Sequence, residues 1–376
     1  MKFIHLSDLH LGKRVNEFSM IEDQEYILTK IINVIDEEEP DGVLIAGDVY
    51  DRTIPSEDAM KLWDNFLIKL AKRKVPVYAI SGNHDSAVRF ADHSKLVETT
   101  GIHLAPVFNG EVEMVSVEDK DGKVNIYMLP FVKPVVVRQF FPEEEIKDYT
   151  DACRVVVEHM NVNEKERNIL IAHQFVTGAA RCESEEVVVG GLDNVDVSVF
   201  DVFDYVALGH IHGKQSIGRE TVRYCGTPLK YSFSEKDHQK SVSVVEIGKK
   251  GEVAIREIPL VPKHDLREIK GTYEELTCKK NYDGTPVDDY IHAVLTDEDD
   301  IPDAMGKLQI IYPNLMKLSY DNKRTRENRK IEDIQDIEKK SELELFEEFY
   351  EMQNNQGMSE EQRAFASDLI QSIWGY

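Results

Sequence analysis

Five short polar clusters hold the residues of this chain whose types and spacing could do chemistry. They are Asp8-Leu9-His10, Gly47-Asp48, Gly82-Asn83-His84-Asp85, His173 and Gly209-His210-Ile211-His212. Each follows an apolar run that is typical of a strand in a buried sheet. In open α/β sheets, ligands bind where such strands end. We therefore expect the five clusters to meet in one site, although they are far apart in the sequence.

Carboxylates and imidazoles in these clusters are suited to binding two divalent cations. Side chains two residues apart point the same way if the backbone stays extended, as those of Asp8 and His10 can, and likewise those of His210 and His212, so residues far apart in the sequence could hold one ion. Two cations a few ångströms apart can neutralise a phosphodiester, deliver hydroxide and assist the leaving alkoxide. Several His ligands favour manganese, iron or zinc over magnesium, and we expect Mn2+. The sequence thus predicts a phosphoesterase with two metal ions.

The charge of the chain argues against unaided binding to nucleic acid. The formal net charge is −25 over 376 residues, whereas sequence-independent DNA binding depends on Lys and Arg contacts to phosphate. Residues 331–376 are especially acidic, with 12 Asp or Glu and 3 Lys or Arg. If the substrate is DNA, metals or a partner must supply much of the attraction.

Residues 1–235 alternate strand-like runs with helical patterns, which indicates a layered α/β domain. The patterns predict helices over 22–38, 56–73 and 143–160, and hairpins that turn at 119–122 and 248–251. Strands over 290–296 and 314–320, flanking a helix at 302–311, predict a small α+β module. We assign residues 236–322 to the second hairpin and this capping module, and residues 323–341 to a charged linker.

The end of the chain has the pattern of two amphipathic helices. The basic cluster at 323–330 precedes them and is either a solvated linker or a strap that contacts phosphate. Ser359 and Gln362 form a capping box for the second helix. The helices either cover their own domain or dock on a partner protein, and we predict docking through Phe346, Phe349, Phe365, Leu369 and Trp374.

The remaining features have ordinary interpretations. The four cysteines are scattered without a C-x-x-C pair, which fits small apolar fillers in a reducing compartment. No apolar run approaches the roughly 18 residues that a membrane span needs, so we expect a cytoplasmic protein. We interpret His93, His103 and His159 as surface or packing residues.

At the five clusters the sequence resembles the calcineurin-like metallophosphoesterase superfamily. The signature of that superfamily runs D-x-H, G-D-x-x-D/H, G-N-H-D/E, H and G-H-x-H, and the resemblance covers roughly residues 1–235. Within the superfamily, residues 5–12, the acidic cap and the helical tail are most similar to bacterial nuclease subunits that work with an SMC-like ATPase. The resemblance implies a two-layered β-sandwich flanked by helices, with a capping domain and a C-terminal helix pair.

The resemblance also implies a role for each residue of the site. One ion would be bound by Asp8, His10 and His212. The other would be bound by Asn83, His173 and His210, with Asp48 bridging both.

A catalytic group is implied beside these ligands. His84 would stabilise the scissile phosphate or protonate the leaving oxygen. Asp51 matches the second acid of the G-D-x-x-D pattern, where archaeal and eukaryotic relatives commonly have His, so it either orients His84 or meets substrate. Arg52 could contact a phosphate or form a surface salt bridge.

Three classes of function remain open at this point. The first is a DNA nuclease in a repair complex, with ATP-stimulated 3′–5′ exonuclease activity on duplex ends and endonuclease activity on single strands or hairpins. There we expect a homodimer within a heterotetramer. The second is a stand-alone phosphodiesterase or phosphatase, and the third is a scaffold without metals. Intact ligands disfavour the third, and the cap, the basic cluster and the tail favour the first.

Overall fold

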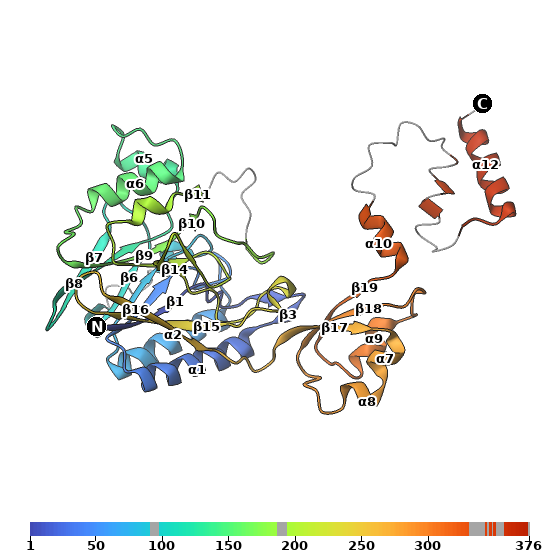
Figure 1. The fold of residues 1–376 in the computed structure, drawn as a ribbon, viewed down its shortest axis with the longest axis horizontal. Coiled ribbons are helices and arrows are strands. Elements are labelled where there is room, and N and C mark those ends of the chain that lie inside the picture. Colours follow the sequence, from blue (N-terminus) through green and yellow to red (C-terminus); the bar gives the residue numbers. More distant parts are fainter. Residues whose placement is uncertain are drawn as a thin grey trace. The chain divides into compact units, whose positions relative to one another are not determined.

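The computed structural model describes residues 1–90, 98–185, 194–330, 343, 346–347, 349–350 and 357–374. It divides into two compact units, Met1–Asp265 and Leu266–Tyr376 (Figure 1). In the described part of the chain, none of the helices combines the length and the apolar character needed to cross a membrane.

The first unit contains two six-stranded sheets. In spatial order the first sheet consists of β16 (Val253–Pro259), β15 (Ser241–Ile247), β1 (Lys2–Leu6), β4 (Gly42–Ala46), β5 (Val77–Ile80) and β6 (Ile102–Ala105). The second consists of β13 (Gln215–Ile217), β14 (Arg219–Tyr224), β12 (Tyr205–Gly209), β9 (Arg167–His173), β8 (Gly122–Leu129) and β7 (Glu113–Asp119). In each sheet the central strands are parallel, so their carboxyl ends lie along one edge.

The two sheets pack face to face around a common core. Phe3 and Leu44 of the first sheet are buried in one cluster with Ile126, Ile171 and Ala207 of the second. Helices cover the outer faces: α1 (Ile21–Glu38) and α2 (Glu57–Arg73) lie beside the first sheet (Figure 1), and α6 (Tyr149–His159) packs on the second. This arrangement confirms the predicted sandwich flanked by helices.

Helix α6 begins later than the sequence pattern predicts. Residues 143–148 precede it, and the Asp148 side chain accepts a hydrogen bond from the Asp151 N–H, which caps the helix. The helices that the sequence placed at 22–38 and 56–73 are α1 and α2. Helix α5 (Pro134–Phe140) was not predicted.

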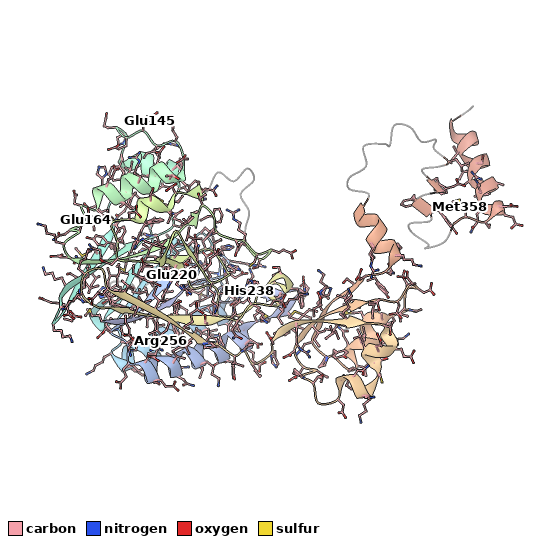
Figure 2. The ribbon with its side chains drawn as sticks, viewed as in Figure 1. Glu145, Glu164, Glu220, His238, Arg256 and Met358 are labelled. Atoms are coloured by element: carbon pink, nitrogen blue, oxygen red, sulfur yellow. The ribbon has the colours of Figure 1, made fainter. Side chains whose placement is uncertain are left out.

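The second hairpin belongs to the first unit and not to the capping module where the sequence placed it. Strand β15 pairs antiparallel with β1, and β16 pairs with β15, so both strands extend the first sheet. Arg256 on β16, labelled in Figure 2, forms an ion pair with Glu38 of α1. The hairpin covers the edge that β1 would otherwise expose, which moves the boundary of the first unit to Asp265.

The second unit contains a three-stranded parallel sheet. Its strands are β17 (Leu266–Gly271), β18 (Tyr290–Leu295) and β19 (Leu315–Tyr320), and its helices include α7 (Tyr273–Thr277), α8 (Lys279–Tyr282) and α9 (Ala304–Gln309). Strand β17 was not predicted, because its sequence, Leu-Arg-Glu-Ile-Lys-Gly, has little apolar alternation.

The basic cluster, predicted to be part of a solvated linker or a strap, forms helix α10 (Lys323–Lys330). Arg324 pairs with Asp300, and Arg326 pairs with Asp321, so two of its cations are neutralised within the same unit. Residues 331–341, the rest of the predicted linker, lie outside the described residues. The capping box of α12 (Glu360–Trp374) is present, because Ser359 and Gln362 exchange hydrogen bonds.

The short elements of the first unit complete the fold. They are β2 (Arg14–Val15), β3 (Phe18–Ser19), α3 (Ala87–Phe90), β10 (Phe175–Val176), β11 (Asn194–Val195) and the 3₁₀ helices η1 (Glu98–Thr100), η2 (Val197–Phe200) and η3 (Phe233–Glu235).

Candidate metal centre

The five clusters meet at the carboxyl ends of the parallel strands of both sheets. Asp8 and Asp48 follow β1 and β4, and His173 is the last residue of β9. His210 and His212 follow β12. The predicted convergence of distant residues is therefore present, because strands of both sheets end at one edge.

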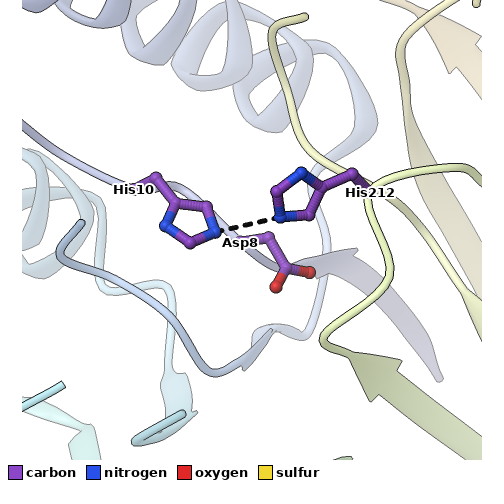
Figure 3. Close-up of side chains that lie close together, drawn as sticks. All are labelled: Asp8, His10 and His212. Carbon is purple, nitrogen blue, oxygen red and sulfur yellow. Dashed lines mark hydrogen bonds between the residues drawn. The ribbon is translucent and has the colours of Figure 1, made fainter. Parts of the chain in front are cut away.

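One group of donor atoms consists of Asp8, His10 and His212 (Figure 3). All three side chains are buried, and their donor atoms lie within 4.8 Å of one another. His10 Nε2 and His212 Nε2 are 3.1 Å apart. Two nitrogens that each bind one ion at about 2.1 Å, at tetrahedral or octahedral angles, lie roughly 3.0–3.4 Å apart. The spacing therefore fits two ligands of one metal ion.

A second group surrounds Asn83 Oδ1. His173 Nε2 and His210 Nδ1 each lie 3.0 Å from this oxygen. Asp48 Oδ2 lies 3.3 Å from His173 Nε2 and 3.8 Å from His10 Nε2, so this carboxylate reaches both groups. Asp8 also lies within 4.8 Å of the donors of Asp48 and His173. The two groups are thus adjacent, with Asp48 between them.

The electrostatics of the buried site suit bound cations. Burial raises the pKa of Asp8, and burial alone would do the same to Asp48, but His173 and His10 outweigh it and lower the pKa of Asp48. Burial lowers the pKa of His10 well below its usual range and that of His210 to about 3. Neutral His10 and His210 are in the protonation state that metal binding requires. Burial opposes protonation of His173, but Asp48 outweighs it and raises the pKa of His173 to about 9, so a metal ion bound there would displace a proton.

The backbone at the ligands is left-handed and not extended. Asp8, His10, Asp48 and His210 have φ angles of 52°, 44°, 49° and 101°. The extended backbone that the sequence analysis assumed for Asp8 and His10 is therefore wrong, because β1 ends at Leu6 and a turn directs both side chains into the site. Left-handed non-glycine residues are costly and cluster at functional sites.

Glycines in the clusters allow the backbone to approach the ligands closely. A Cβ on Gly82 would lie 2.1 Å from Asp48 Oδ1, and a Cβ on Gly47 would lie 2.4 Å from His173 Nδ1. At Gly209 it would lie 1.8 Å from the carbonyl oxygen of Ala46. No side chain fits at these contacts, which explains why glycine precedes the ligands in three clusters.

His84 lies beside the ligands, with its main chain tied to them. Its N–H donates to Asp48 Oδ1 at 2.9 Å, and its ring Nδ1–H donates to the carbonyl oxygen of Asp51 at 3.0 Å. The ring Nε2 lies 3.9 Å from Asp48 Oδ2. A carbonyl group, which only accepts, thus fixes Nδ1–H and leaves Nε2 directed at the site.

The Asp51 carboxylate does not contact the His84 ring in the way the sequence suggested. It pairs with Lys13 Nζ at 2.8 Å and lies 3.6 Å from His10 Nδ1. Arg52 is exposed, and its Nε lies 3.7 Å from Asp51 Oδ2, as in a surface salt bridge. The main-chain carbonyl of Asp51, and not its carboxylate, therefore orients the His84 ring.

Two supporting residues escaped the sequence analysis. Buried Gln24 donates to the carbonyl of His10 at 2.7 Å and accepts from the Gly12 N–H at 2.9 Å, so α1 holds the loop that carries His10. Asp85 accepts hydrogen bonds from three backbone N–H groups around the Asp48 turn. Asp85 belongs to one of the predicted clusters, but nothing in the sequence indicates this supporting role, which its three hydrogen bonds show.

The other predicted residues fall outside this centre. His103 stacks on Tyr78, and the His159 ring nitrogen bonds the carbonyl of Val155, so both are packing residues, as predicted. His93 lies outside the described residues. In the second unit, the side chains predicted to dock are exposed by 43%, 54%, 70% and 48% for Phe346, Phe349, Phe365 and Leu369. The side chain of Trp374, at the end of α12, is not among those described.

Comparisons with known proteins agree with this site. Residues 1–214 match the calcineurin-like phosphoesterase family, and residues 262–354 match the family described as type 5 capsule protein repressor C-terminal domain. The D subunit of the nuclease SbcCD from Staphylococcus epidermidis is 32% identical over 383 residues, covering 100% of this chain and 98% of that protein. The corresponding SbcCD protein of Staphylococcus saprophyticus is 35% identical, covering 85% and 84%.

Solved structures were matched at lower similarity. A dimetal phosphatase from Danio rerio has a TM-score of 0.42 and 11% identity, covering 69% of this chain and 96% of that one. The protein TT1561 of Thermus thermophilus has a TM-score of 0.38 and 9% identity, covering 68% and 98%. From the family match and the full-length relatives, the chain belongs to the calcineurin-like phosphoesterases, in the SbcD nuclease family, and is a metal-dependent phosphodiesterase with a dinuclear site for divalent metals.

Proposed function

We propose that this chain is a DNA nuclease that works with an SbcC-like, SMC-family ATPase in DNA repair and recombination. Its activities would be an ATP-stimulated 3′–5′ exonuclease on duplex ends and an endonuclease on single strands or hairpins. The observation that supports this most is the pair of donor groups that share Asp48, with His84 beside them. The relatives are named as subunits of the nuclease SbcCD, which supports a nucleic acid as the substrate.

The ligand roles follow the two donor groups. We assign Asp8, His10 and His212 to one ion, Asn83, His173 and His210 to the other, and Asp48 to both. When bound, the ions supply charge neutralisation and an activated nucleophile. The residues supply geometry: His173 donates Nδ1–H to the carbonyl of Ala46 at 2.8 Å, so its Nε2 lone pair faces Asn83 and Asp48.

His84 is the residue we assign to proton transfer or phosphate stabilisation. Because Nδ1–H is committed to the Asp51 carbonyl, Nε2 is the atom that can hold a proton for the leaving oxygen. The main-chain N–H of the same residue holds Asp48 Oδ1. His84 thus couples the position of the shared carboxylate to that of the catalytic ring.

Two cations beside His210 support a nucleic-acid substrate despite the acidic chain. The rings of Phe131 and Phe175 each lie 6.4 Å from the His210 ring, centroid to centroid. Lys133 Nζ lies 5.9 Å from the Phe131 centroid, and the guanidinium of Arg181 lies 3.5 Å from the Phe175 centroid. We propose that these cations meet the phosphates that flank the scissile one.

The tail is the part we assign to the ATPase. Exposed aromatic side chains on an acidic segment suit docking on a partner better than contact with DNA, whose phosphates repel carboxylates. Docking would also bring DNA to a chain with a net charge of −25. The active assembly would be a homodimer of this chain within a heterotetramer.

Mn2+ is the metal we propose for the site. The donor set mixes imidazole nitrogens with carboxylate and amide oxygens, which suits Mn2+ better than Mg2+. Metal-depleted protein should therefore regain most activity with Mn2+. Full recovery with Mg2+, with Mn2+ inactive, would refute this assignment.

The deciding experiment compares linear duplex DNA with a small chromogenic phosphodiester, using the full chain and a chain that lacks residues 342–376. The full chain with the ATPase should cleave DNA faster when ATP is present. The truncated chain should hydrolyse the small diester at the normal rate but lose complex formation and ATP stimulation. Hydrolysis of the small diester with no DNA cleavage would favour a stand-alone phosphodiesterase. A truncated chain that keeps the complex but melts at a lower temperature would exclude docking by the tail.

A further inference from the structure

A buried chain of polar side chains leads away from the second ring nitrogen of His212. His212 Nδ1 lies 2.7 Å from Ser184 Oγ, and Ser184 Oγ lies 2.7 Å from Glu235 Oε1. The other oxygen of Glu235 accepts a hydrogen bond from the Lys240 ammonium, which also donates to Thr227 Oγ1 at 2.7 Å. Glu235 is fully buried and Lys240 nearly so. An ion pair inside the protein is thus connected to a ligand imidazole through one hydroxyl.

The hydrogen bonds that connect His212, Ser184, Glu235 and Lys240 can run in only one direction. Lys240 only donates, and an ionised Glu235 only accepts. The Lys240 ammonium is paired with the buried Glu235 side chain, so Glu235 is the carboxylate of an ion pair and has no proton to donate. Ser184 therefore gives its single proton to Glu235 and must accept from His212. That requires the proton of His212 to be on Nδ1, which leaves a lone pair on Nε2.

The same group of residues fixes the main chain of His212. Glu185 Oε1 accepts the His212 N–H at 2.6 Å. Lys240 Nζ donates to the His212 carbonyl at 2.9 Å, and the Thr227 N–H donates to it at 3.2 Å. Ring and backbone are thus held by one network, as in metal sites whose outer residues orient the ligands.

We propose that Glu235, held by Lys240, is a positioning residue that acts through Ser184 to fix His212 in the tautomer that binds metal. The inference rests on the assignment of His212 as a metal ligand in the proposed function.

Replacing Glu235 with Gln should reverse the direction of the hydrogen bonds between residue 235, Ser184 and His212. Lys240 is a charged donor, so we expect the amide oxygen of Gln to turn to Lys240 and its NH2 group to turn to Ser184. The Tyr231 N–H, which Glu235 Oε1 accepts at 3.2 Å, would then lose its acceptor, so Glu235→Gln should also be less stable. Ser184 would then accept from Gln and donate to His212 Nδ1, which moves the imidazole proton to Nε2. The variant keeps nearly the same shape but presents the wrong nitrogen to the metal.

The test uses the full chain and two measurements. Nitrogen-15 NMR of the metal-free protein reports the His212 tautomer, and calorimetric titration with Mn2+ reports the affinity of each site. We expect Glu235→Gln to shift the tautomer and to weaken one Mn2+ site by about 10- to 100-fold, with the other site unchanged. Ser184→Ala should weaken the same site and leave the ion pair of Glu235 and Lys240 intact, so it decides the matter even where Glu235→Gln does not fold.

Ser234→Ala is the matched control. Ser234 Oγ accepts the Glu183 N–H at 3.1 Å, so it bridges the same two segments without entering the chain to His212. This variant should keep both Mn2+ affinities and the normal tautomer. Equal losses in Ser234→Ala and Ser184→Ala would mean that only loop anchoring matters, and would overturn the proposal.

Two further outcomes would also overturn it. One is a Glu235→Gln variant in which His212 keeps its normal tautomer. The other is a Ser184→Ala variant in which the affinities of both Mn2+ sites are unchanged. The His212→Ala variant shows whether the positioning role of Glu235 is wrong or the assignment of His212 as a metal ligand is wrong. If that variant keeps both Mn2+ sites, His212 is not a ligand and the proposed metal set is wrong.

Discussion

Replacement of His84 with Gln isolates the catalytic group from the metal ligands. The Gln variant keeps the main-chain N–H that donates to Asp48 Oδ1 at 2.9 Å, so the shared carboxylate stays in place. It loses the ring that is oriented by the Asp51 carbonyl. A positioned general acid contributes about 10²- to 10⁴-fold, so kcat should fall by that factor, or about 3–5 kcal/mol in activation free energy.

The assay compares two substrates, with Mn2+ affinity measured alongside. A chromogenic diester has an acidic leaving group that needs little protonation, whereas DNA has a poor one. If His84 protonates the leaving oxygen, the loss should be larger on DNA. Equal losses on both substrates would assign His84 to stabilising the phosphate. Loss of Mn2+ from His84→Gln, or an unchanged kcat on DNA, would refute its assignment as a catalytic group outside the ligand set.

Asp51→Asn is the control for the orientation of His84. A carbonyl and not a carboxylate holds the ring, so this variant should retain most activity. A loss as large as that of His84→Gln would show that the carboxylate is the orienting group.

Three other perturbations test separate parts of the account. Gly82→Ala would place a Cβ 2.1 Å from Asp48 Oδ1, so we expect weaker Mn2+ binding by calorimetry and a loss of activity of at least about 10²-fold. Glu235 has a pKa of about 2 in the folded state, lowered from 4.5. Its ionised form therefore stabilises the folded protein fully above pH 4.5, and this contribution is lost as the pH falls to 2. Over this pH range the free energy of urea unfolding should fall by about 3 kcal/mol more in the wild type than in Glu235→Gln, in which only the other carboxylates titrate. Lys133→Gln combined with Arg181→Gln should raise KM for an oligonucleotide about 10-fold and reduce its salt dependence, with no effect on a small diester.

The sequence predicts which residues lie together in the site, because the pattern of buried parallel strands can be recognised in it. Apolar runs that end in Asp, Asn or His identify strands, and parallel strands end at one edge. The gathering of Asp8 and Asp48 follows from that order, whereas His173 ends a strand of the other sheet and its place in the site was implied by the family resemblance. Long amphipathic helices such as α1 and α2 are also predicted well, because their periodicity extends over many residues.

Local geometry and long-range support could not be predicted. The left-handed backbone at Asp8 and His10 is set by hydrogen bonds to the neighbouring Asp48 loop, such as the Asp8 N–H to the Gly47 carbonyl at 3.0 Å. The connection of Ser184 to Glu235 joins segments about 50 residues apart that carry no motif. The second hairpin was misplaced because a hairpin pattern does not say which sheet edge it will cover.

The central claim is that one shared carboxylate joins two metal ions in a single site. Titration of metal-free protein with Mn2+, in the wild type and in Asp48→Ala, tests it most directly. We predict two ions per chain in the wild type and weaker binding of both in the variant, because Asp48 Oδ2 reaches His10 and His173 alike. A single ion per chain in the wild type, or a variant that loses one ion while the other binds normally, would contradict the account.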